Sequence, residues 1–76
     1  MNTAAKDRVS YARNDTAAAL RSLQSAAEWL DKVAQDCPTL ADRVTGLSRQ
    51  LWATADVVRD VESSIAGIHA DLRAVS

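Results

Sequence analysis

The sequence predicts an all-α protein: a long antiparallel two-helix hairpin of coiled-coil type that pairs with a second copy into a four-helix bundle. Alanine is its most frequent residue, and the 76 residues include two glycines and no phenylalanine, which favours helices over strands. Apolar residues follow a heptad spacing in each half of the chain. The only proline lies between the two halves, and the length allows one domain over residues 1–76.

The first half predicts a helix over about residues 4–36. Its apolar positions are separated alternately by four and three residues, which places them on one side of a helix. This stripe consists of Ala5, Val9, Ala12, Thr16, Ala19, Leu23, Ala26, Leu30, Val33 and Cys37. Proline disfavours helical geometry in the residue before it, so the helix is expected to end near Asp36.

The segment Asp36-Cys37-Pro38-Thr39 predicts a tight turn over about residues 37–39. Thr39 and Asp42 have the spacing of a capping box, in which a side-chain oxygen accepts a backbone N–H. Alternatively, Pro38 is the first residue of the second helix, where its missing N–H costs nothing. Either form gives a short connection, and short connections place consecutive helices antiparallel.

The second half predicts a helix over about residues 40–75 with the same alternating spacing. This stripe consists of Leu40, Val44, Leu47, Leu51, Thr54, Val58, Val61, Ile65, Ile68, Leu72 and Val75. Folding back at the turn sets Leu30 beside Leu47 and Ala26 beside Leu51. The same register sets three acid–base pairs on the flanks: Arg8 with Asp71, Arg13 with Glu62, and Asp36 with Arg43.

Two helices alone form a core only one seam wide, so apolar residues outside the stripes predict further contacts. We expect a homodimer interface on the small-residue flank formed by Leu20, Ala27, Ala34 and Ala55. We expect a protein partner to bind Trp29, Val57, Trp52 and Ala53, since tryptophan commonly anchors interfaces. Which flank dimerises and which binds the target stays open, as does an exchange of helices between chains.

Gly46 and Gly67 occupy the same heptad position of the second helix, where each costs about 1 kcal/mol relative to alanine. Either another backbone approaches them, or they are tolerated on an exposed surface. Cys37 is expected to close the end of the seam as a small apolar residue, with a redox role as the alternative.

The chain carries no pattern typical of catalysis, and we expect no enzymatic activity, no cofactor and no metal. His69 is the only histidine and is expected at the surface near the open end of the hairpin, whereas a metal site needs several ligands. No glycine-rich phosphate loop and no paired CxxC motif is present.

Charge and hydropathy exclude several classes of partner. The net charge is −1 with acids and bases intermixed, so neither nucleic acid nor a membrane surface is an expected partner. The segment 1–15 lacks the apolar run of a signal peptide, and a single cysteine suits a reducing compartment. We therefore expect a cytoplasmic protein, or one exported without a Sec-type signal.

These features predict a non-enzymatic protein-binding module, of inhibitor or adaptor type, that occludes or scaffolds a larger protein. In size and outline the chain resembles the helical-hairpin proteins of type III secretion, both needle subunits and small chaperones, although its turn departs from their proline-flanked turn. It is similar in the same way to small phage-encoded inhibitors of bacterial complexes. The resemblance implies a secretion chaperone or a filament subunit as the alternative, and a nucleic-acid-binding regulator is the second alternative.

Overall fold

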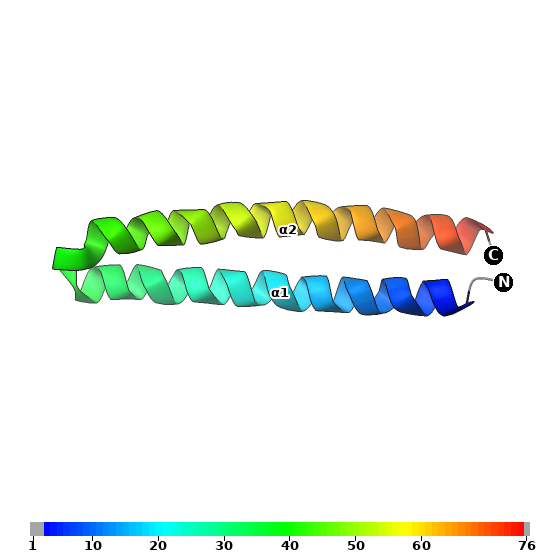
Figure 1. The fold of residues 1–76 in the computed structure, drawn as a ribbon, viewed down its shortest axis with the longest axis horizontal. Helices are drawn as coiled ribbons and strands as arrows, with labels where there is room; N and C mark the ends of the chain where they lie inside the picture. The colour runs from blue at the N-terminus through cyan, green and yellow to red at the C-terminus, as the bar shows by residue number, and fades with distance from the viewer. Residues whose placement is uncertain (1–2, 76) are drawn as a thin grey trace.

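A computed structural model of the chain describes residues 3–75. Helix α1 spans Thr3–Asp36, a short 3-10 helix η1 spans Pro38–Leu40, and helix α2 spans Ala41–Val75. The two long helices run antiparallel and pack against each other along their length (Figure 1). The predicted all-α helical hairpin is thereby confirmed, and the predicted helix starts at about 4 and 40 differ from these by one residue.

The turn follows from the proline. Cys37 has φ −132° and ψ 82°, the extended geometry that a following proline favours. Its N–H donates to the carbonyl of Val33 at 2.9 Å, and its carbonyl accepts from the N–H of Leu40 at 3.0 Å. Pro38 begins η1, where its missing N–H costs no hydrogen bond. Within residues 3–75 the Thr39 hydroxyl makes no hydrogen bond, so the proline alternative, not the capping box, describes this turn.

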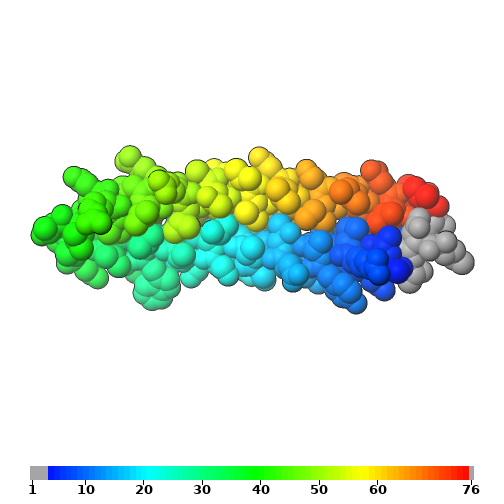
Figure 2. Space-filling view, viewed as in Figure 1, coloured from blue at the N-terminus to red at the C-terminus, as the bar shows by residue number. Residues whose placement is uncertain are grey.

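The hairpin is an elongated single layer. Its principal extents are 58 × 14 × 10 Å, and the space-filling view shows the helices in contact from the turn to the open end (Figure 2). The radius of gyration is 17.2 Å. A compact domain of this length would have a radius of gyration of about 11 Å. Most residues therefore lie at or near the surface.

The seam between α1 and α2 is rotated from the predicted one. Ala27 and Ala55 are 0% exposed and Ser48 is 2% exposed, and each lies one residue after a predicted core position. Half of each predicted stripe stays in the seam. These half-buried residues are Ala5, Val9, Thr16, Leu23 and Leu30 of α1, Cys37 of the turn, and Val44, Leu51, Val58, Ile65 and Leu72 of α2. The other half is exposed, including Ala26 and Leu47, which corrects the predicted core pairs.

The rotation has a packing reason. Ala27, Ser48 and Ala55 are among the smallest side chains on their helices, and small residues at the contact line let two helices approach closely. A closer approach brings more atoms of the flanking leucines and valines into van der Waals contact. The predicted pairing of positions along the two helices is nevertheless correct, because Ser48 lies beside the helical turn of α1 that runs from Ala27 to Asp31.

The residues of the predicted dimer interface lie in or beside the seam of the single hairpin. Ala27 and Ala55 are fully buried, and Leu20 and Ala34 are half-buried, between the two helices of one chain. In this arrangement a second chain could contact Leu20 and Ala34, whereas Ala27 and Ala55 are covered. Self-association through this flank stays a prediction.

The predicted acid–base pairs do not form within the part of the chain that the structure describes. Arg8, Arg13 and Asp36 make no ion pair with their expected partners. Arg59 instead pairs with Asp56 of the same helix at 3.1 Å, and both side chains are exposed. Such a surface pair adds at most about 1 kcal/mol to stability, so the hairpin depends on its seam.

Candidate protein-binding face

The exposed half of the predicted stripes is apolar except at Thr54. On α2, the side chains of Leu47 and Ile68 are 53% and 51% exposed. We define the open face as Ala12, Ala19, Ala26 and Val33 of α1 with Leu40 of η1 and Leu47, Val61 and Ile68 of α2. Its members recur at seven-residue spacing, with Thr54 at the one position left out between Leu47 and Val61, so the face extends along most of the hairpin.

Helical geometry places both lines of the open face on one side of the hairpin. Residues three and four positions after Leu23 lie on either side of it, and Ala27 turns toward α2, so Ala26 turns away from the seam. On α2, the same rule places Leu47 and Ser48 on either side of Val44. The exposed residue precedes the buried residue by one position on both helices. Because the two helices are antiparallel and face each other, this places both exposed lines on the same side of the hairpin.

The opposite side of the hairpin is polar. Here Ser48 donates to Asp31, and a hollow near the open end lies between the two helices. That hollow is lined by Ser10, Arg13, Asn14, Ala17, Glu62 and His69. The predicted neighbours Arg13 and Glu62 thus share this hollow without forming an ion pair. The hairpin is therefore a slab with one apolar and one polar side, and an uncovered apolar side marks an interaction surface.

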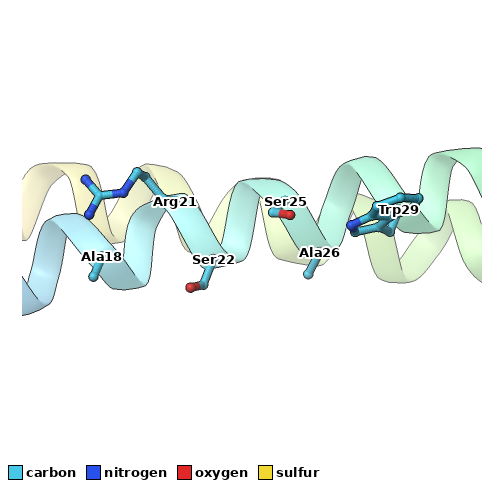
Figure 3. Close-up of a pocket in the computed structure, with 6 residues that line it drawn as sticks. All are labelled: Ala18, Arg21, Ser22, Ser25, Ala26 and Trp29. Carbon is cyan, nitrogen blue, oxygen red and sulfur yellow. The ribbon is translucent and has the colours of Figure 1, made fainter.

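Trp29 lies at the α1 edge of the open face. Its side chain is 64% exposed, and the ammonium of Lys32 lies 4.5 Å from the centre of its ring. Beside it is a shallow hollow lined by Ala18, Arg21, Ser22, Ser25, Ala26 and Trp29. Figure 3 shows Ser22 and Ala26 pointing to one side of α1 and Arg21 to the other. An exposed aromatic ring beside small side chains suits the insertion of an apolar side chain from another protein.

The structure separates the other predicted partner-binding residues. Val57 is 61% exposed at the α2 edge of the open face, across the face from Trp29. Ala53 is exposed on the outer side of α2, and Trp52 is 37% exposed toward the polar side. One hairpin thus presents Trp29 and Val57 on two edges, not on one shared flank.

Both glycines of α2 face open space. A Cβ atom built on Gly46 or Gly67 meets nothing within 4 Å. The hairpin itself therefore makes no close backbone contact at either position. Within the chain, nothing requires glycine there or offsets its lower helix propensity.

The groups capable of chemistry are dispersed. Within residues 3–75 no group of three or more His, Cys, Asp or Glu side chains is arranged to hold a metal ion. Cys37 is a half-buried free thiol at the turn, and His69 is half-buried in the polar hollow, not freely exposed as expected.

No helix among the described residues is long and apolar enough to span a membrane. In comparisons with known proteins, the chain matches no family model, no curated protein and no solved structure. The open face and its edges are therefore the features of the hairpin that indicate a function.

Proposed function

We propose that this chain is a non-enzymatic protein-binding module that acts by occluding or scaffolding other proteins. The open face is the observation that supports it. Leu47, Val61 and Ile68 project from α2 at the same heptad position and are about half exposed, whereas their heptad pattern is that of a helix core. Covering a face with this pattern by another apolar surface is favourable in water, and such an exposed face marks an interaction site.

The surface area of the hairpin supports the same proposal. The chain has a mass of 8.2 kDa and exposes 5515 Å². A compact monomer of that mass exposes about 4,500 Å², so the hairpin carries an excess of about 1,000 Å². A standard protein–protein interface buries about 800 Å² on each partner. The excess therefore matches the area that one protein partner would cover.

The edges of the open face supply the anchors for a target protein. Trp29 and Val57 are both more than 60% exposed. Tryptophan is enriched among the residues that dominate binding energy, because it buries a large area with few rotatable bonds. We assign Trp29 and Val57 as primary contacts, with Trp52 and Ala53 as further contacts.

Photo-crosslinking in the cells that express the chain tests this proposal. A benzophenone amino acid replaces Leu47 on the open face, Val57 at its edge, or Ala70 as the control, an exposed position of α2 on the polar side. We expect adducts from positions 47 and 57, including adducts with a protein other than the chain itself, and none from position 70. An absence of adducts with any other protein from both positions would contradict the proposed function.

A further inference from the structure

The edges of the open face carry four charges with no partner across the hairpin. Arg8 and Asp36 lie at the α1 edge, near the open end and the turn, and Asp71 and Arg43 lie at the same two levels of the α2 edge. The apolar face separates each acid from its base, and neither pair forms within the described residues. At each end of the hairpin, one edge of the face nevertheless carries a base and the other edge carries an acid.

We propose that the open face is covered by a second copy of the chain, stacked face to face with both turns at the same end. This inference rests on the proposed function, because it names the occupant of the same face. The two-fold axis then runs along the length of the bundle. Helix α1 of each copy lies over α2 of the other, and all neighbouring helices are antiparallel, as in a four-helix bundle.

Side-chain size favours this arrangement. On the open face α1 contributes mainly alanine, at positions 12, 19 and 26, whereas α2 contributes Leu47, Val61 and Ile68. Placing α1 over α2 sets small residues against large ones along the bundle, so the spacing between the hairpins is even. With the turns at opposite ends, α1 would lie over α1 of the second copy and α2 over α2. Alanine would then face alanine and large residues would face large residues, so the two hairpins could not pack at one even distance.

Charge is compatible with the same arrangement. With both turns at one end, Arg8 of each copy lies beside Asp71 of the second copy, and Asp36 lies beside Arg43 of the second copy. These are the pairs that a single chain leaves unformed. Turns at opposite ends would instead bring Arg43 of one copy to Asp71 of the other, which is also an attractive contact. The edge charges therefore do not select an orientation, and each pair adds little affinity, but the two orientations pair different residues and charge reversal can tell them apart.

The stacking also explains the shallow hollow on α1. Val57 of the second copy lies at the level of Ala18 and Ser22, and its exposed side chain faces the hollow that these small residues leave beside Trp29. Trp29 of one copy and Val57 of the other then share one edge of the bundle. The two predicted anchors, separated on one hairpin, form a joint target surface on the dimer.

Sedimentation equilibrium of the full chain tests whether a second copy covers the face. We expect a mass twice the 8.2 kDa of the chain at micromolar concentration. Ile68→Glu should reduce the mass to that of one chain, whereas Ala70→Glu, which adds the same charge on the polar side, should remain dimeric. A wild-type chain that stays monomeric up to millimolar concentration overturns the proposal. Adducts of a different protein from position 47 would then leave the proposed function standing.

Mixing two charge variants tests the arrangement without altering the apolar face. Chains carrying Arg8→Asp place two acids together in their homodimer, and chains carrying Asp71→Arg place two bases together. In the mixed dimer both contacts become attractive. We expect native mass spectrometry to give a ratio of mixed dimer to homodimers several-fold above random pairing. The matched control mixes Arg43→Asp with Asp71→Arg and should pair at random. A preference in the control mixture alone, or in neither mixture, overturns the arrangement.

Discussion

The hydroxyl oxygen of Ser48 lies 2.6 Å from Oδ1 of Asp31, across the seam between α2 and α1. Ser48 is 2% exposed, and its oxygen is also 3.4 Å from the carbonyl of Ala27. The single hydroxyl proton is donated to the carboxylate, the nearer and charged acceptor. This bond connects the two helices on the polar side, opposite the open face, and fixes their rotation.

Replacing Ser48 with alanine should therefore destabilise the hairpin. A hydrogen bond to a charged group is worth about 1.5–3 kcal/mol, and the better helix propensity of alanine offsets about 0.5 kcal/mol of the loss. We expect a net loss of about 1–2 kcal/mol in the free energy of unfolding, measured by urea denaturation. Asp31→Asn keeps an acceptor oxygen and should lose less. Equal stability of Ser48→Ala and wild type would show that the bond does not hold the seam.

A larger residue at Ala27 should disrupt the seam. Ala27 is 0% exposed, so Ala27→Leu forces three additional carbon atoms into a filled contact line. Overpacking of this kind typically costs about 1–3 kcal/mol. Thermal unfolding followed by circular dichroism measures the loss. Ala70→Leu makes the same change at an exposed position and should be neutral; equal effects at both positions would place Ala27 outside the seam.

The sequence was sufficient to predict the helices and the turn, because these depend on local signals. The heptad stripes and Pro38 determine where each helix runs and where the chain reverses. The rotation about the helix axes was not predictable in the same way. Small residues recur at seven-residue spacing at Ala27, Ala34, Ser48 and Ala55, and that pattern indicates close approach without indicating which helix approaches.

The candidate site was missed for a related reason. The heptad stripe of Leu47, Val61 and Ile68 predicts the core of a single hairpin, yet the same stripe also describes a helix facing the centre of a larger bundle. Two helices have one contact line and cannot cover both halves of such a stripe. Trp29 and Val57 were recognisable as anchors, since neither fits a stripe, but their positions on opposite edges follow only from the folded seam.

The two glycines of α2 offer a stabilising change. Nothing lies within 4 Å of a Cβ at Gly46 or Gly67, and the proposed dimer leaves both on the outer side of the bundle. Alanine at either position should raise stability by about 1 kcal/mol, because it restricts the unfolded chain and favours the helix. A rise in the midpoint of thermal unfolding checks this. If Gly67→Ala lowered the midpoint while Gly46→Ala raised it, another backbone would have to approach Gly67.

Replacing Trp29 with alanine separates target binding from folding. The ring is 64% exposed and contacts Lys32, so its removal leaves the seam and the apolar face unchanged. We expect the same helicity and the same sedimentation mass as wild type. Binding to the partner identified by crosslinking should weaken by about 2 kcal/mol, about 30-fold, if Trp29 anchors the interface. Tyr11→Ala is the matched control, because Tyr11 is also an aromatic residue of α1 with 64% exposure and lies away from the hollow. A target affinity reduced equally by both changes would indicate general loss of apolar surface, and an affinity reduced only by Tyr11→Ala would move the target to the open end of the hairpin.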